Sequence, residues 1–288
     1  MITRRLGAHV SVAGSLLRAT EEATRIGANT IQIFSSSPRQ WKASKLDPHD
    51  VKAFRTAREK LDIQPMAIHC SYLINLAAAE DEIFLKSAVG MRGEIERAIQ
   101  LDADYLVAHP GSCKGQCAED AIARLTVGMR EAARGLKSTR LKFLWEITAG
   151  QGQALGSDIG QLKEIAARTA EVLEIPVGYC VDTAHCFAAG LDLFDVLREL
   201  GQENVPVIHT NDSKVPFGSR LDRHEHIGKG YIGKEAFRRY LTHPDLRDKA
   251  FILETPENDD GDHAQNLSTL KQLCRKSRTT LTKSSSGG

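Results

Sequence analysis

Short apolar runs alternate with longer segments of helical character along this chain. Eight apolar runs have the length and composition of buried strands, and they lie at 5–9, 29–34, 64–69, 104–109, 141–146, 178–182, 205–209 and 249–254. Segments with helical periodicity or helix-forming composition follow them, at 14–27, 48–61, 80–101, 118–137, 158–174, 191–200, 233–242 and 264–275. Strands that alternate with helices in this way predict βαβ units and a parallel sheet.

The number of units favours one way of building such a sheet. Eight strand–helix units in 288 residues fit a closed (β/α)₈ barrel, the TIM barrel, in a single domain. A doubly wound open sheet is the main alternative, but it gathers its ligands at one switch point rather than at many strand ends. We therefore predict an α/β barrel domain over 1–275. The tail 276–288, rich in Ser, Thr, Gly and Lys, is predicted to be disordered.

Six of the apolar runs end in a histidine or an acid. The runs and their last residues are MAIH (His69), YLVAH (His109), FLWE (Glu146), YCVD (Asp182), VPVIH (His209) and FILE (Glu254). In a barrel of this kind the carboxyl ends of the strands converge on one face, so these side chains should meet there. Three carboxylates in one cleft repel one another unless cations intervene. The pattern therefore predicts bound divalent metals.

Two further segments, in the loops predicted after the sixth and seventh strands, add candidate ligands. DTAHCFAAG carries His185 three residues after Asp182, and RLDRHEHIG carries Asp222, His224 and His226. Imidazole with carboxylate and no thiolate suits Zn²⁺, and Mn²⁺ or Fe²⁺ to a lesser degree. One catalytic zinc takes only three protein ligands, so this many candidates indicate two or three ions, an arrangement typical of phosphate-ester cleavage. A lone histidine at a strand end is usually an ordinary polar residue, and we expect His263 at the surface.

Composition and charge indicate the cellular compartment of the protein but do not identify its substrate. The formal net charge of +1 neither demands nor excludes a nucleic-acid partner. Six cysteines occur without C-x-x-C spacing, which is typical of free thiols in a reducing compartment. The N-terminus has no apolar signal-like region, and no segment reaches the roughly 20 apolar residues that span a bilayer. A cytoplasmic protein without a membrane partner is expected.

Nine short motifs, taken together, resemble the endonuclease IV family of apurinic/apyrimidinic-site DNA repair enzymes. They are GAHVS at 7–11, RQW at 39–41, HCSYLINLA at 69–77, AHPGS at 108–112, TAGQG at 148–152, DTAHCFAAG at 182–190, HTNDSK at 209–214, FGSRLDRHEHIGKGYIG at 217–233 and ILETP at 252–256. The run at 217–233 is highly specific, whereas GAHVS or AHPGS alone would be weak. The resemblance covers residues 5 to about 256 in the expected order.

The resemblance implies a site with three Zn²⁺ ions, for which Mn²⁺ or Fe²⁺ could substitute. The implied ligand sets are His69, His109 and Glu146 for one ion; Glu146, Asp182, His209 and Glu254 for a second; and His185, Asp222 and His224 for a third. Glu146 would bridge two ions, and Glu254 would also orient the attacking water, so both are implied as catalytic. The family does not use His226 as a ligand.

The implied reaction is hydrolysis of the phosphodiester bond 5′ to an abasic site during base excision repair. It leaves a 3′-hydroxyl and a 5′-deoxyribose phosphate, and a 3′-end repair activity could accompany it. The partner is double-stranded DNA with abasic sites, bound by a monomer. Side chains that wedge into the base stack help expose such a sugar. Arg39, Trp41, Tyr72 and Leu73 are the candidates, although Tyr72 and Leu73 could instead cap the barrel.

Two other classes of function stay open at this point. Sugar isomerases use a similar barrel with two metals, but they predict a small closed pocket and have no need of the RQW or YLIN segments. A DNA-binding module without catalysis predicts binding without turnover.

Two residues depart from the family pattern. Ile147 stands after Glu146 where the family usually has Asn, so a hydrogen bond that supports the metal ligands would be missing. Trp145 is bulkier than expected at its position.

His9, in the GAHVS motif, is either an ordinary polar residue or a supporting neighbour of the ligands.

Overall fold

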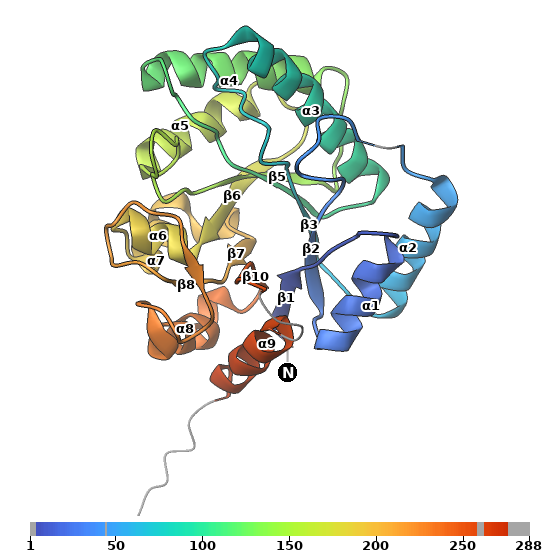
Figure 1. Ribbon diagram of the computed structural model, residues 1–288, viewed down its shortest axis with the longest axis vertical. Helices are drawn as coiled ribbons and strands as arrows, with labels where there is room; N and C mark the ends of the chain where they lie inside the picture. The colour runs from blue at the N-terminus through green and yellow to red at the C-terminus, as the bar shows by residue number, and fades with distance from the viewer. Residues whose placement is uncertain (1–3, 44, 258–261, 276–288) are drawn as a thin grey trace, which may run out of the picture.

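The computed structural model describes residues 4–43, 45–257 and 262–275, and these form a closed barrel (Figure 1). Its eight parallel strands are β1 (Arg5–His9), β2 (Thr30–Phe34), β3 (Met66–His69), β4 (Tyr105–Ala108), β5 (Lys142–Glu146), β6 (Val177–Asp182), β7 (Val207–His209) and β10 (Ala250–Leu253). β1 pairs with both β2 and β10, so the ring has no open edge. The predicted TIM barrel is confirmed, and the open sheet is excluded. The predicted tail at 276–288 lies outside the described residues.

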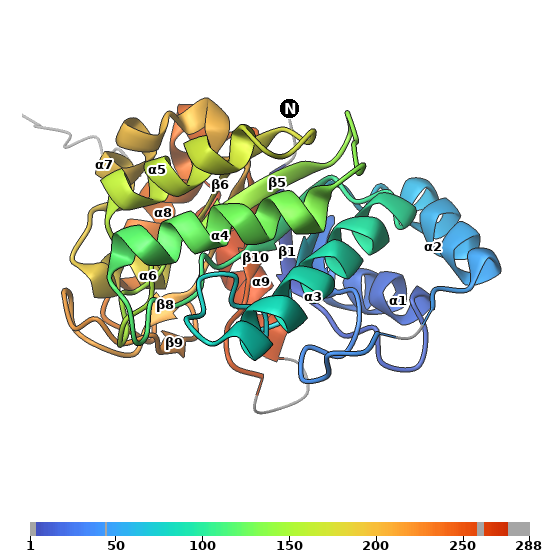
Figure 2. The ribbon, with the colours of Figure 1, turned by 90° about the horizontal axis from the view of Figure 1, so that it is seen from above.

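Helices surround the barrel on its outside (Figures 1 and 2). They are α1 (Leu17–Ile26), α2 (Pro48–Lys60), α3 (Asp81–Gln100), α4 (Ala118–Ala133), α5 (Ile159–Ala170), α6 (Thr183–Ala189), α7 (Leu193–Leu200), α8 (Gly233–Thr242) and α9 (Asp262–Leu273). Two short 3₁₀ turns, η1 (Gln202–Asn204) and η2 (Pro244–Leu246), follow α7 and α8. Within the described ranges, no helix combines the length and apolar character that crossing a bilayer requires.

The segment after β6 differs from the sequence-based expectation, which treated DTAHCFAAG as a loop. It forms helix α6, because the Asp182 side chain accepts hydrogen bonds from the backbone N–H groups of Ala184 and His185. Such a side-chain cap satisfies donors that a helix start otherwise leaves unpaired. Gly190 ends the helix in a left-handed conformation. A short antiparallel pair, β8 (Asp212–Ser213) with β9 (His224–Glu225), lies beside α6 (Figure 2).

Two apolar layers hold the architecture together. Small and medium side chains from six strands form a cluster of their own: Ala67, Val107, Leu144, Cys180, Val207, Ala250 and Ile252. A second and larger cluster joins the strands to the helices and includes Trp145, whose indole N–H donates to Thr169 Oγ1 on α5 at 2.9 Å. The bulk of Trp145 is therefore buried between the barrel and helix α5.

β1 and β2 approach so closely at Gly7 that only glycine fits there. A Cβ on Gly7 would lie 1.8 Å from the backbone oxygen of Thr30. Gly7→Ala should therefore lower the free energy of unfolding by at least about 2 kcal/mol, because two paired strands must separate. Gly93→Ala on α3 is the matched control, since a Cβ there has no neighbour within 4 Å. It should stabilise the helix by about 0.5–1 kcal/mol. Urea denaturation of both variants measures the difference, and equal midpoints would contradict it.

Candidate metal centre

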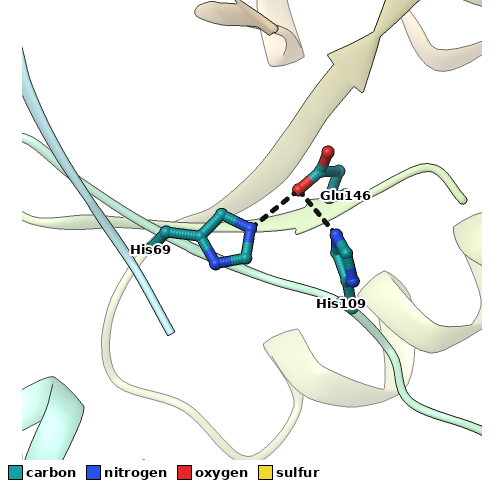
Figure 3. Close-up of side chains that lie close together, drawn as sticks. All are labelled: His69, His109 and Glu146. Atoms are coloured by element: carbon teal, nitrogen blue, oxygen red, sulfur yellow. Dashed lines mark hydrogen bonds and ion pairs between the residues drawn. The ribbon is translucent and has the colours of Figure 1, made fainter. Parts of the chain in front are cut away.

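The buried carboxylate of Glu146 lies at the centre of the converging strand ends. Its Oε2 is 3.1 Å from His69 Nε2 and 3.1 Å from His109 Nε2 (Figure 3). Its Oε1 is 2.9 Å from His209 Nδ1 and 3.3 Å from His185 Nδ1. The side chain of Glu146 is fully buried. Four imidazoles from four different segments therefore surround one carboxylate.

The predicted ligands fall into overlapping groups, and within each group the donor atoms lie within 4.8 Å of one another. These groups are His69, His109 and Glu146; Glu146, Asp182, His209 and Glu254; and Asp182, His185 and His224. The half-buried Asp222 adds to the third, because its carboxylate oxygens lie 3.2 Å from His185 Nε2 and 3.2 Å from His224 Nε2. The structure thus brings all nine predicted residues together. That they bind metal stays a prediction at this point.

A cavity of about 350 Å³ opens onto these groups. Glu254 and His224 line it with partly exposed side chains, and Asp222 lies at its rim. His263 also lines this cavity and is buried, so its predicted surface position is wrong. It packs there because α9 carries it to within 3.5 Å of Glu257. A ligand in the cavity would meet imidazole and carboxylate groups on several sides.

Charge pairing changes the protonation of the site. Burial would raise the pKa of Glu146, but His209, His109 and His185 hold that pKa well below its usual range. Burial would lower the pKa of His224, but Asp182 and Asp222 outweigh it and raise that pKa to about 9. Burial would also lower the pKa of His209, but the side chains of Cys180, Glu146 and Glu254 outweigh it and raise that pKa well above its ordinary value. The carboxylate of Glu146 is thus ionised, and His209 and His224 hold protons that a metal would have to displace.

The donor set fits a divalent cation. His224 Nε2 is a buried polar atom without a hydrogen-bond partner among the described residues, and it points between two carboxylates. Nitrogen and oxygen donors in this mixture suit Zn²⁺, Mn²⁺ or Fe²⁺. A cation there would give the orphaned nitrogen a partner and offset the gathered negative charge.

Backbone carbonyls orient three of the imidazoles. The Nδ1 atoms of His69, His185 and His224 lie 2.8, 2.9 and 3.1 Å from the backbone oxygens of Cys70, Ile147 and Glu254 respectively. An Nδ1–H that donates to a carbonyl leaves Nε2 with the lone pair that a metal needs. Ile147 supports the site in this way through its backbone. Its side chain packs in the core, so the position that usually carries Asn supplies no side-chain hydrogen bond here.

Sequence reasoning missed three polar side chains next to the ligands: Gln32, Cys180 and Asn211. Cys180 lies with Glu146 and His209 in one more group of donor atoms. The sequence could have predicted this position, because Cys180 precedes Asp182 by two residues on one strand and therefore shares its face. Its burial raises the pKa of the thiol to about 12, so it stays protonated. His226 instead lies 3.0 Å from Asn266 Nδ2 and belongs to no ligand group among the described residues.

The four predicted DNA-binding side chains lie on the two loops after β2 and β3. Tyr72 is 67% exposed at the mouth of the cavity, and its ring centre is 5.1 Å from that of Phe34. Leu73 is half-buried, and Arg39 is exposed. Trp41 is 39% exposed, and its ring lies over Gly90 of α3. Tyr72 is therefore the candidate closest to the site, whereas Trp41 lies towards the outer helices.

Known proteins share this fold and this sequence over nearly the whole chain. A family model described as a xylose isomerase-like TIM barrel matches residues 20–273. A protein named probable endonuclease 4 from Solibacter usitatus is 48% identical over 279 residues, which is 93% of this chain and 96% of the relative. The chain belongs to the endonuclease 4 family. Endonuclease 4 from Thermus thermophilus is 40% identical over 93% of this chain and 97% of its own.

Solved structures agree with this membership in the endonuclease 4 family. A crystal structure of endonuclease IV from Thermus thermophilus superposes with a TM-score of 0.82 at 38% identity, covering 93% of this chain and 98% of that one. A D-tagatose 3-epimerase-like protein has a TM-score of 0.70 at 19% identity over 93% of this chain and 96% of that one. The second likeness shows the shared barrel alone. The resemblance predicted from the motifs is confirmed.

Metal binding to this endonuclease 4 family member should release protons. Below its pKa of about 9, His224 carries a proton on the nitrogen that faces the carboxylates, and a metal must displace it. Zinc affinity should therefore fall as the pH falls below that value, and at least about one proton per chain should be released near neutral pH. Calorimetric titration of metal-free protein in two buffers with different protonation enthalpies counts these protons. Identical heats in both buffers would contradict the expectation.

Proposed function

We propose that this protein is a metal-dependent endonuclease that cleaves DNA on the 5′ side of an abasic site. The observation that carries the proposal is the Glu146 carboxylate, which contacts four imidazoles at the barrel mouth in a chain of the endonuclease 4 family. The reaction is phosphodiester hydrolysis that leaves a 3′-hydroxyl and a 5′-deoxyribose phosphate, with 3′-end repair as an accompanying activity. A cytoplasmic monomer that acts on double-stranded DNA fits this role.

Three zinc ions per chain are proposed, with the residues divided as the groups of donor atoms suggest. His69, His109 and Glu146 would hold one ion. Glu146, Asp182, His209 and Glu254 would hold another, and His185, Asp222 and His224 the third. Clustered cations supply positive charge that stabilises the attacking and leaving oxygens of a phosphate ester and acidify the attacking water.

The protein's own residues supply orientation and charge. Glu146, shared between two groups, would place a negative charge between neighbouring cations and offset part of their mutual repulsion. Glu254 lines the cavity with a partly exposed carboxylate, so it can accept a hydrogen bond from the water that attacks phosphorus. The leaving 3′ oxygen takes up a proton from solvent, and the deoxyribose keeps the phosphate.

DNA is proposed to bind across the loops after β2 and β3. Tyr72 and Leu73 would wedge into the base stack, and Arg39 and Trp41 would contact the backbone and a neighbouring base. An abasic nucleotide has already lost its stacking, so moving its sugar into the cavity costs less than moving a normal nucleotide. That difference in cost provides selectivity for damaged DNA.

Removal of metal should abolish cleavage. Dialysis against a strong chelator should leave no detectable cutting of a duplex that contains one tetrahydrofuran abasic-site analogue, and zinc should restore it. Elemental analysis should find about three metal ions per active chain, as two or three ions suit such a ligand set. Undiminished cutting by metal-free protein would refute the metal requirement. Ketose isomerisation without DNA cleavage would favour the sugar isomerase class instead.

Tyr72→Ala should weaken binding to abasic duplex by about tenfold or more, because stacking of an aromatic ring on a base is worth about 1–3 kcal/mol. Metal content should stay unchanged, since the ring centre of Tyr72 is 6.4 Å from that of His69. Tyr72→Phe is the matched control, because it keeps the ring and removes only the hydroxyl, and it should bind like the wild type. Fluorescence anisotropy measures both. Equal affinity of the alanine variant would remove Tyr72 from the wedge role.

A further inference from the structure

Gln32 is a fully buried polar side chain in the middle of β2. It is not itself a proposed metal ligand, but it contacts two of them, His209 and Glu254. Its amide Nε2 donates to Glu254 Oε1 at 2.5 Å. Its Oε1 lies 2.8 Å from His209 Nε2, and its Nε2 also lies 3.1 Å from His9 Nδ1. A buried amide with partners at both ends is held in one orientation.

That orientation follows from the chemistry of the partners. An ionised carboxylate only accepts hydrogen bonds, so the NH₂ end of the Gln32 amide must face Glu254. The carbonyl end then faces His209, so His209 Nε2 must carry a hydrogen and donate it. The nitrogen of His209 that remains for a metal is Nδ1. This atom lies 2.9 Å from Glu146 Oε1 and 3.2 Å from Glu254 Oε2, where a cation would meet all three groups.

His209 is oriented differently from its neighbours. His69, His185 and His224 each lie with Nδ1 against a backbone carbonyl, which no substitution removes. His209 has the opposite arrangement, and the side chain of Gln32 holds its Nε2. The orientation of His209 therefore depends on a side chain that can be substituted, whereas backbone carbonyls orient His69, His185 and His224.

Glu254 depends on Gln32 as well. Its backbone N–H donates to Asn211 Oδ1 at 2.7 Å, which positions the residue. Its carboxylate receives the Gln32 amide on Oε1, and this leaves Oε2 directed towards His209 Nδ1. Gln32 thus aims two of the four side chains in the group of Glu146, Asp182, His209 and Glu254.

We propose that Gln32 is a positioning residue for the cation held by Glu146, Asp182, His209 and Glu254, because it selects Nδ1 of His209 as the binding nitrogen and directs the Glu254 carboxylate. The proposal rests on the metal site of the proposed function. It does not extend to the cations at His69 and His109 or at His185, Asp222 and His224, since the side-chain hydrogen bonds of Gln32 go to His9, His209 and Glu254.

Zinc binding by two Gln32 variants and a matched control tests the proposal. Gln32→Leu keeps the volume and removes all three side-chain hydrogen bonds. Gln32→Glu keeps the shape and the acceptor for His209 but sets a carboxylate against Glu254. Thr30→Val is the control, because Thr30 is equally buried on the same strand and its hydroxyl donates to the backbone oxygen of Pro65, away from the ligands. Zinc per chain after dialysis and zinc affinity against a competing chelator are the measured quantities.

Both Gln32 variants should lose one zinc per chain, or bind it at least about tenfold more weakly, while the remaining zinc ions stay bound. Thr30→Val should keep the wild-type zinc content and affinity. In cobalt-loaded protein, the visible absorption should lose the contribution of one site in the Gln32 variants alone. If Gln32→Leu fails to fold, Gln32→Glu carries the same comparison.

Wild-type zinc content and affinity in both Gln32 variants would overturn the proposal and leave the proposed function intact. An equal loss in Thr30→Val would also overturn it, because the effect would then belong to the packing of β2 in general. Wild-type protein that binds no zinc at all would instead refute the metal site of the proposed function.

Discussion

The buried carboxylate of Glu146 is the constraint on which the rest of the site depends. A fully buried carboxylate is unfavourable unless compensating charge lies next to it. The barrel meets this requirement by bringing His69, His109, His185 and His209 to within 3.3 Å of the two oxygens. No single strand or helix could do so, because each strand end contributes one direction of approach. The closed ring of parallel strands is therefore the reason that such a centre can exist.

Rigidity around Glu146 comes from two kinds of hydrogen bond. Backbone carbonyls fix most of the imidazole rings, so those rings are oriented wherever the barrel is folded. Side-chain amides do the rest, with Gln32 holding His209 and Glu254, and Asn211 donating to Asp182 Oδ2 at 2.6 Å. Beneath them, the apolar side chains of six strands fill the barrel. The polar side chains of the site thus lie above a packed apolar layer. Their hydrogen bonds orient the donor atoms before a cation binds.

The sequence predicted the barrel and the converging strand ends because a buried parallel strand is a short continuous apolar run whose last residue is easy to identify. Asp222 and His224 were found from their motif, although nothing in the chain pattern indicated that the pairing of β8 with β9 would place His224, and Asp222 just before it, beside the other ligands. Helix α6 was missed, because its start depends on Asp182 as a cap. Gln32 was missed since one polar residue within TIQIF has no meaning until the ring closes and His209 and Glu254, distant in sequence, become its neighbours.

Asp182 ends strand β6, caps helix α6 and faces the ligands at the same time. One of its oxygens accepts from the backbone at the start of α6, while the other accepts from Asn211. Helix α6 in turn carries His185. Replacing Asp182 therefore removes a donor atom and loosens the segment that presents a second one. A histidine at this position could supply a donor atom but would leave the start of the helix uncapped. The start of α6 and the donor set therefore depend on the same carboxylate.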